Sequence, residues 1–371
     1  MMCHSKRYLY LLILIVVIST TGTFSFIAAA TPVIQEHPRL FFRQGDWNDG
    51  LGLTTSDLRS RYARRDAAVV REQLGGSLAN NALRALILQV YPDSAALSRD
   101  AAEQAIARLR EPIDCENPTT EQGLQLSFYA MAYDWLYSHP SFNEASRKTA
   151  RGNIASAANS LVRELGSGSH IFHTRMYGWP LGVAMAGLAL DREHPDAGSF
   201  VDFGGDFFQE RLFPARRLQD GAVHNSFGYG RKYTMWQTGH FISCWHSSTG
   251  QNLWQTIDTG QDGWARREML FNIYGRYPDG TYLRFGDSYS LTSDFYSFRA
   301  VSERVAAYRD PVGQGFLQML IEQNAGKVVE KPSAYIYFLN YDPELKSVPV
   351  STLPSAKLFS RDGLGMAIWK S

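Results

Sequence analysis

Apolar residues recur at steps of three and four residues along much of this chain. This spacing places them on one face of an α-helix, which then buries that face against a core. Because each run carries one narrow stripe, the pattern predicts amphipathic helices packed side by side. The runs are Leu78-Ala82-Leu86-Val90, Leu124-Phe128-Met131-Trp135 and Leu181-Met185-Leu188.

Short breaker sequences separate these helical runs. They are Tyr91-Pro92-Asp93, Glu116-Asn117-Pro118 and His139-Pro140, which are typical of loops. No strand pattern lies between them, so the helices are expected to stack as hairpins. No strict residue-level repeat is present, which argues against a solenoid of the tetratricopeptide type. The predicted fold is therefore mostly α, an incomplete (α/α) toroid of helical hairpins over residues 31–330, with loops at one end forming a cleft.

The pattern changes toward the C-terminus. Pro278-Asp279-Gly280 predicts a turn followed by a short alternating run, and helical sequence resumes over about 294–326. Residues 357–369 are expected to form a hairpin about a glycine-containing turn. Because a single hairpin is marginally stable in water, residues 331–371 are interpreted as the beginning of an antiparallel β-sandwich domain that the chain does not complete.

The N-terminus has the features of a secretory signal peptide. Lys6 and Arg7 precede an apolar run over 8–18, and an alanine-rich cleavage site ends at Ala30. The apolar run is too short to span a bilayer as a helix, although an uncleaved anchor is the alternative. The prediction is a secreted or periplasmic protein cleaved after Ala30, with no stable membrane insertion after cleavage.

Charge and cysteine content limit the partners. The 37 Lys and Arg residues nearly balance the 36 Asp and Glu residues, so no positive excess points to nucleic acid. After loss of the signal peptide, Cys115 and Cys244 remain, which permits one disulfide and provides no cysteine-based metal motif. The 8 Trp, 19 Tyr and 21 Phe residues suit a large core and carbohydrate stacking equally well.

Residues 220–236 concentrate the groups that an acidic sugar requires. An Asp-Gly turn leads through a glycine-punctuated polar loop into a helix, on which Tyr229, Tyr233 and Trp236 share one face. Cations and amides suit a carboxylate, aromatic rings stack on sugars, and phenols transfer protons. The alternative is an aromatic core helix that follows a polar loop. The polar members of the segment are His224, Asn225, Arg231 and Lys232.

The order of several segments resembles the heparinase II/III-like polysaccharide lyases, a group that includes alginate and oligoalginate lyases. The resemblance covers nearly all of the chain after residue 30, and it rests on the order and spacing of short motifs. The matching segments are His37-Pro38-Arg39-Leu40-Phe41-Phe42, Ala132-Tyr133-Asp134-Trp135-Leu136-Tyr137, His170-Ile171-Phe172-His173 leading into 184–190, 220–233, Arg284-Phe285-Gly286-Asp287-Ser288 and Gly363-Leu364-Gly365-Met366.

This resemblance implies an incomplete (α/α) toroid followed by a β-sandwich, and β-elimination at a uronic acid. In such enzymes an Asn or His neutralises the uronate carboxylate, a Tyr or His removes the C5 proton, and a Tyr commonly protonates the leaving O4. The implied function is a secreted lyase that cleaves a uronic-acid-containing polysaccharide of the alginate or heparin/heparan type.

Carrying the family roles over gives one histidine, His173 with His170 as its alternative, and two tyrosines as catalytic candidates. The family's His at the start of the inner helix falls on His173 or His170, for which the alternative is a surface-loop His. The catalytic Tyr is Tyr229 or Tyr233, and the sequence does not choose between them. A Tyr serves as a base only if its pKa falls below about 10, which nearby cations promote. Core packing is the alternative for either Tyr.

The substrate-binding candidates combine cations, amides and aromatic rings. The tryptophans have core packing as their alternative, and Arg284 has an exposed salt bridge. Asp287 is interpreted as a turn residue. His170 and His173 lack a third ligand, so no metal is predicted, and a family zinc site would lie in the absent part of the β domain. No cofactor is expected. The candidates are His170, Arg175, Trp179, His224, Asn225, Arg231, Trp236 and Arg284.

The chain departs from the family in two respects. Many relatives carry an acidic residue near His224, and none stands there. The family's further catalytic His lies in the β-sandwich, whereas no His follows His246, which predicts weak or absent turnover. One alternative is an (α/α)-toroid glycoside hydrolase, which needs two placed carboxylates, yet Asp220 is the single acidic residue in 220–236. A second alternative is a non-catalytic glycan-binding protein.

Overall fold

The computed structural model describes residues 31–45, 52–64, 74–165, 173, 175–257, 263–286, 294–324, 334–359 and 365–369. Contacts divide the chain into Met1–Ala30 and Thr31–Ser371, and the structure described here belongs to the second unit. The predicted signal peptide lies outside the described residues. Within the described ranges, no helix has both the length and the apolar character needed to cross a bilayer.

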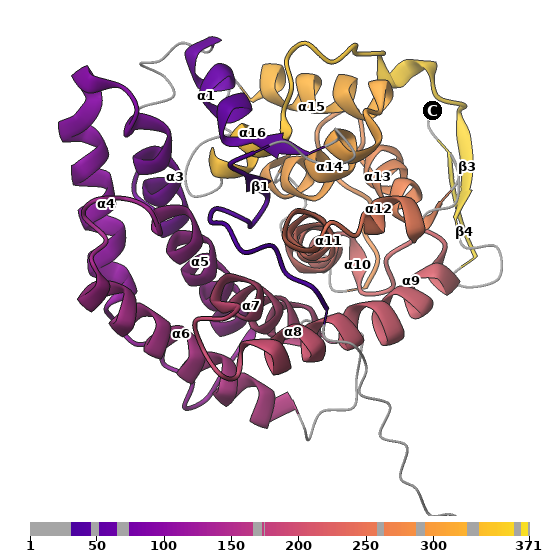
Figure 1. Ribbon diagram of the computed structural model, residues 1–371. Helices are drawn as coiled ribbons and strands as arrows, with labels where there is room; N and C mark the ends of the chain where they lie inside the picture. The colour runs from indigo at the N-terminus through magenta and orange to yellow at the C-terminus, as the bar shows by residue number, and fades with distance from the viewer. Residues whose placement is uncertain are drawn as a thin grey trace, which may run out of the picture. The chain divides into compact units, whose positions relative to one another are not determined.

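The unit is mostly helical, as predicted (Figure 1). The three predicted apolar stripes fall on α3, α5 and α7, and each proline-containing breaker lies between α-helices, with Pro92 and Asp93 in a 3-10 turn. Val90 is the exception, because α3 ends at Leu88 and Val90 is exposed. The first helices are α1 (Thr55–Arg64), α3 (Leu78–Leu88), α4 (Ala95–Leu109), α5 (Thr120–Leu136), α6 (Glu144–Leu165), α7 (Arg175–Leu190) and α8 (Ala197–Asp206).

The second half of the chain continues with helices and ends, in its described part, with a small antiparallel sheet. Two of its helical turns are of the π type, Phe207–Leu212 and Gly230–Thr234, and short 3-10 turns occur at Pro92–Ser94 and Val350–Thr352. The remaining helices are α9 (Phe213–Gln219), α10 (Ser226–Tyr229), α11 (Met235–Thr249), α12 (Leu253–Thr256), α13 (Trp264–Tyr274), α14 (Asp294–Tyr308), α15 (Pro311–Gln323) and α16 (Ala334–Asn340).

Helices that follow one another pack together, as stacked hairpins require. Contacts join α3 to α4, α7 to α8, and α14 to α15, while α5 packs along α7. Glycines permit the close approach of α5 and α7, because a Cβ on Gly182 would lie 2.3 Å from the carbonyl oxygen of Gly123. These pairings establish the helical class, and closure of the helices into a toroid stays a prediction.

The segment 37–42 runs through the protein interior and connects α5 with α11. Asp134 on α5 accepts backbone N–H bonds from Arg39 (2.9 Å) and Leu40 (2.8 Å). Ser247 Oγ on α11 accepts the N–H of Phe41 at 2.7 Å. Leu40 and Phe42 are fully buried. This segment is therefore buried and links the two helices, and β1 (Phe42–Arg43) at its end pairs in parallel with β2 (Leu53–Thr54).

The C-terminal part differs from the expectation at its start. Residues Ala334–Asn340 form α16, which packs on α14 and α3, so this stretch belongs to the helical body. The predicted hairpin is present as antiparallel β3 (Ala356–Phe359) and β4 (Met366–Trp369). Phe359 is buried and its ring packs on Phe271 at 5.1 Å. The turn at 278–280 is also confirmed, since the backbone N–H of Gly280 donates to Tyr277 at 3.0 Å.

Candidate functional site

The predicted site segment has an unusual backbone. Ser226 has φ +89°, a conformation that residues with a Cβ rarely adopt. The helix it opens, α10, passes into a π-helix over Gly230–Thr234 before α11 begins at Met235. A π turn and a strained non-glycine residue each cost stability, and both are common at functional sites. Gly221 (φ +87°) precedes them, where a Cβ would lie 2.4 Å from the Cβ of Arg267.

Tyr229 lies directly before this π-helix and Tyr233 lies within it, and their rings are neighbours. Their ring centroids are 5.7 Å apart with an interplanar angle of 31°. The Tyr233 hydroxyl donates to Glu121 Oε1 on α5 at 3.4 Å, and Lys232 Nζ lies 4.8 Å from the centre of the Tyr233 ring. Burial would lower the pKa of Lys232, but its contact with Tyr233 and the charge of Glu121 raise it overall. Lys232 thus stays an ammonium ion beside the tyrosines.

A second cation, on α14, lies next to this pair. The guanidinium of Arg299 lies 4.0 Å from the ring centre of Trp236, and its Nη2 donates to the carbonyl of Lys232 at 2.6 Å. Burial lowers the pKa of Arg299 to about 10, which leaves it charged at neutral pH. Trp236 is itself fully buried, and its indole N–H donates to the same carbonyl of Lys232. Sequence reasoning missed Arg299 because α14 carries no motif there.

Arg231 takes a different position from the one predicted. Its side chain is fully buried, with Nε donating to the carbonyl of Phe227 and Nη1 donating to Ser297 Oγ, both at 3.1 Å. Its guanidinium stacks 3.6 Å from the ring centre of Tyr282. Burial lowers its pKa. Arg231 therefore faces the interior, where it contacts the backbone next to Ser226. Its buried position does not fit a direct contact with substrate.

Two amide side chains near the π-helix have buried polar atoms that lack a hydrogen-bond partner among the described residues. Asn225 Nδ2 donates to Thr234 Oγ1 at 3.2 Å, but its Oδ1 is buried without a hydrogen-bond partner among the described residues. Both side-chain amide atoms of Gln237 are likewise buried without a described partner. Such groups are rare in folded proteins and each needs a physical reason. His224 pairs through Nδ1 with Gln219 Nε2 at 2.8 Å.

His173, Arg175 and Trp179 lie at or near the start of α7. His173 is exposed directly before this helix, Arg175 is its first residue, and α7 contacts the π-helix. Trp179 is buried and its indole N–H donates to the carbonyl of Thr119 at 2.6 Å, which fits the core alternative. Arg284 is exposed. His170 and Asp287 lie outside the described residues.

The described residues form neither a cluster of metal ligands nor a disulfide. Among the residues that the structure describes, no three His, Cys, Asp or Glu side chains are grouped as metal ligands. Cys115 and Cys244 are both free thiols, so the possible disulfide does not form. Burial raises the pKa of each thiol, well above the usual value for Cys244.

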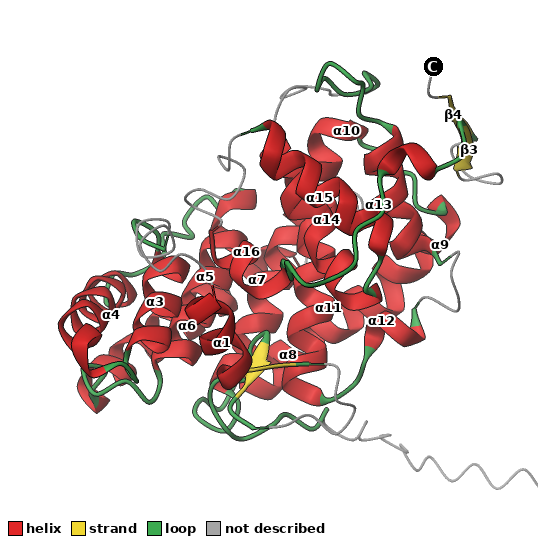
Figure 2. Cartoon of the chain, turned by 90° about the horizontal axis from the view of Figure 1, so that it is seen from above, coloured by secondary structure: helices red, strands yellow, loops and turns green. Residues whose placement is uncertain are grey.

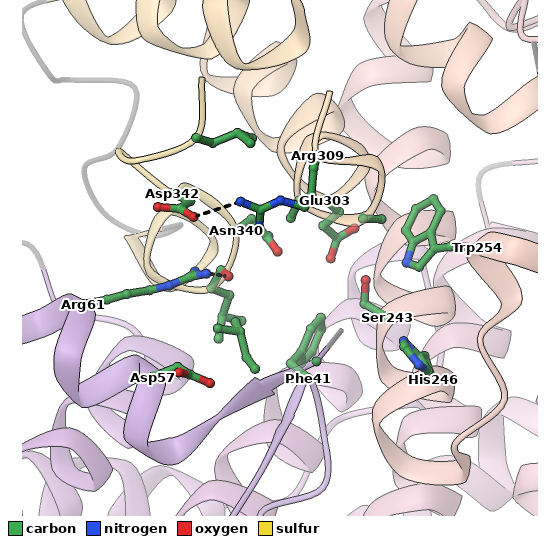
Figure 3. A pocket seen from close by; sticks show the side chains of 16 residues that line it. Phe41, Asp57, Arg61, Ser243, His246, Trp254, Glu303, Arg309, Asn340 and Asp342 are labelled. Carbon is green, nitrogen blue, oxygen red and sulfur yellow. Dashed lines mark hydrogen bonds and ion pairs between the residues drawn. The ribbon is translucent and has the colours of Figure 1, made fainter. Parts of the chain in front are cut away.

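A separate cavity of about 340 Å³ lies at the other end of α11 (Figure 3). It is lined by side chains from the N-terminal segment, α1, α11, α12, α14 and the end of α16. Sequence reasoning did not single out this set, because its members come from distant segments and form no motif. They include Phe41, Asp57, Ser243, His246, Trp254, Glu303 and Asn340.

Comparison with known proteins adds no assignment. No family model matches this chain, and no curated protein matches it. The segment resemblance and the geometry around the π-helix are therefore the two lines of support for the function proposed next.

Proposed function

We propose that this protein is a polysaccharide lyase that cleaves a uronic-acid-containing glycan by β-elimination. One observation carries the proposal: the tyrosine pair Tyr229 and Tyr233 spans a π-helix next to the strained Ser226, with an ammonium and a guanidinium beside it. Strain of this kind persists where the surrounding fold enforces it, and functional sites are where it concentrates. The segment resemblance, which includes this stretch and extends to other parts of the chain, supports the same reaction.

The charges suit the reaction intermediate. Removal of the C5 proton of a uronate places negative charge on its carboxylate, which must be stabilised for the proton to leave. Lys232 lies against Tyr233, and Arg299 donates to the carbonyl of Lys232, so both cations are held before substrate arrives. Preorganised charges of this kind lower the barrier more than mobile ones, because they need no reorganisation during the reaction.

The two tyrosines are assigned different roles in the proposal. The Tyr233 hydroxyl donates to the carboxylate of Glu121 and so carries a proton, which suits the acid that protonates the leaving O4. Tyr229, which lies beside it and is half-buried, is then the base that takes the C5 proton. The C5–H electron pair forms the C4–C5 double bond, the C4–O4 bond breaks, and O4 receives the proton of Tyr233.

The first experiment measures ultraviolet absorbance, reducing ends and glycan binding in parallel, with alginate and heparan sulfate as substrates. Elimination produces an absorbing double bond along with each new end. Reducing ends without absorbance would indicate a hydrolase, and binding without either product would indicate a glycan-binding protein. Either of those results, or silence in all three measurements, would overturn the proposal.

Tyr229→Phe and Tyr233→Phe test the division of roles. Each variant should lower the elimination rate on the natural glycan by about 10²–10⁴-fold, the usual contribution of general acid–base catalysis. A uronide with a 4-O-nitrophenyl leaving group needs no protonation at O4, so it should restore the rate of Tyr233→Phe and leave Tyr229→Phe slow.

Tyr277→Phe is the matched control, because Tyr277 is 46 % exposed and lies in the 276–282 turn, outside the proposed site. It should keep the wild-type rate on both substrates. Wild-type rates in both Tyr229→Phe and Tyr233→Phe would remove the tyrosines from the mechanism. Rescue of Tyr229→Phe alone by the nitrophenyl substrate would reverse the assignment of acid and base.

A further inference from the structure

Glu121, in the first turn of α5, brings a carboxylate to the tyrosine pair. The residue is exposed, and its Oε1 accepts the hydroxyl hydrogen of Tyr233 at 3.4 Å. The charge of Glu121 also acts on Lys232 and Arg299, the two cations of the site. Because the residue is exposed, a glycan bound at the tyrosines can reach this carboxylate.

The fold fixes the start of α5 near the π-helix. Thr119 caps α5, because its side chain accepts the backbone N–H of Glu121 at 3.2 Å and its own N–H donates to Gln122 at 2.7 Å. The carbonyl of Thr119 accepts the indole N–H of Trp179 on α7 at 2.6 Å, and α7 contacts the π-helix. Figure 2 shows α7 between α5 and α11, and it contacts both. The carboxylate is therefore held beside Tyr233 before a glycan binds.

The proposed reaction takes away the hydrogen that Glu121 accepts. A phenol hydroxyl has a single hydrogen, so Tyr233 cannot donate to Glu121 and to O4 of the glycan at the same time. When this hydrogen turns to O4, the carboxylate of Glu121 loses the hydroxyl of Tyr233 as its donor. The bound glycan displaces water from this position, so the replacement donor comes from the glycan itself.

The direction of bond breaking identifies which sugar lies next to Glu121. The C4–O4 bond of the uronate breaks, so O4 departs with the sugar on the other side of the glycosidic bond. The acid that protonates O4 contacts this leaving sugar, and Glu121 Oε1 lies 3.4 Å from the hydroxyl of that acid, Tyr233. The substituent at C2 of the leaving sugar is on the carbon next to the one that carries O4. The geometry therefore directs this substituent toward Glu121.

The charge of Glu121 distinguishes between possible C2 substituents. A hydroxyl or an amino group has a hydrogen to donate, whereas a sulfate ester has none and is anionic. Lys232 and Arg299 stabilise the uronate carboxylate in the proposed reaction, so a sulfate beside Tyr233 would face Glu121. A charge-assisted hydrogen bond is stronger than a neutral one, so an ammonium group suits Glu121 better than a hydroxyl does.

We propose that Glu121 selects glycans whose leaving sugar carries a hydrogen-bond donor at C2, and that an amino sugar with a free ammonium group is preferred. The substrate class is then a glycan in which an unsulfated amino sugar is attached to O4 of the uronic acid. This inference rests on the proposed lyase activity and on the assignment of Tyr233 as the acid.

Three disaccharides test the selection through their elimination rates at about pH 6, where the amine is protonated. Each is the methyl glycoside of glucuronic acid with a glucose-type sugar on O4, and that sugar carries an amino group, a hydroxyl or a sulfate ester at C2. Two unit charges about 4 Å apart in water change an equilibrium constant about fivefold. Because an attraction is gained and a repulsion is avoided, wild-type kcat/KM for the amino compound should exceed that for the sulfated one at least about tenfold, with the hydroxyl compound between them.

Glu121→Gln keeps the size of the side chain and removes its charge. The ratio of kcat/KM between the amino and the sulfated compound should fall at least about fivefold in this variant. Glu103→Gln, at an exposed position on α4, is the matched control and should keep the wild-type ratio. An unchanged ratio in Glu121→Gln, or fastest cleavage of the sulfated compound by the wild type, would refute selection by Glu121.

The 4-O-nitrophenyl uronide, tested with the wild type, separates failure of this inference from failure of the proposed function. This compound has no leaving sugar, so its turnover reports elimination alone. Turnover of it together with equal rates on the three disaccharides would overturn the role of Glu121 and leave the lyase proposal in place. No turnover of any of the four compounds would overturn both.

Discussion

Glu268→Gln should destabilise this protein strongly, because Glu268 holds two buried arginines. Glu268, Arg216 and Arg304 are each at most 1 % exposed. Arg216 donates to one carboxylate oxygen of Glu268 and Arg304 donates to the other. Burial lowers the pKa of Arg216 to about 10, which still leaves it charged at neutral pH. The amide of the variant would leave two cations in the interior with no negative charge between them.

The magnitude follows from what each arginine retains. Arg304 keeps its bonds to three backbone carbonyls, at 2.9–3.1 Å. Arg216 keeps its bond to Gln219, and its Nε already has no described partner. Breaking a buried ion pair by removal of one partner costs about 3–5 kcal/mol. Since a typical protein has about 5–15 kcal/mol of stability, this single change removes a large share of it.

Arg216→Met gives the contrasting case. It removes one buried cation and leaves the pair of Glu268 with Arg304 intact. We therefore expect a smaller cost of about 1–3 kcal/mol, because one oxygen of the carboxylate loses its donor while the charge keeps its pair with Arg304. Urea unfolding followed by circular dichroism measures both variants, with the midpoint and the slope reported separately.

The order of the two variants is the decisive result. If Glu268→Gln cost less than about 1 kcal/mol, or less than Arg216→Met, charge compensation would not be what the carboxylate supplies. The three side chains would then stabilise the protein mainly by packing, and the cost assigned to the two stranded guanidinium groups would be refuted.

Two further predictions concern stability. Gly182→Ala should lower the urea midpoint, because its Cβ would lie 2.3 Å from Gly123 and overpacking costs about 1–3 kcal/mol. The control Gly152→Ala, on α6, meets nothing within 4 Å and should stabilise the protein by up to about 1 kcal/mol. Equal effects of the two substitutions would contradict this reasoning. His37 loses solvation on burial, which lowers its pKa, but hydrogen bonds to Asp134 and Glu193 raise the pKa above 6.5 overall. Its contribution to stability is therefore complete below about pH 6.5 and lost as pH rises through the higher folded-state pKa. The free energy of unfolding of wild type minus that of His37→Gln should fall as the pH rises above about 6.5, and a constant difference would exclude this linkage.

Local spacing by itself determined much of the fold. The stripes that include Leu86, Met131 and Met185 lie on helices because steps of three and four residues align with the helical turn. The turn at 278–280 and the hairpin over 356–369 were readable for the same reason, since proline, glycine and alternation act over a few residues. The pairing of Tyr229 with Tyr233 also follows from a spacing of one helical turn.

Tertiary structure decided which polar groups face the interior. Arg231 and Trp179 belong to the predicted site segments, yet both are buried, because α14 and α7 pack on the π-helix and α7 packs on α5. Residues 334–340 form a helix because α3 and α14 cover them, although their aromatic sequence suits a strand equally well. Arg299, Glu303 and the cavity around Asn340 involve residues far apart in the chain, and the free energy of burying a charge depends on neighbours that no local pattern specifies.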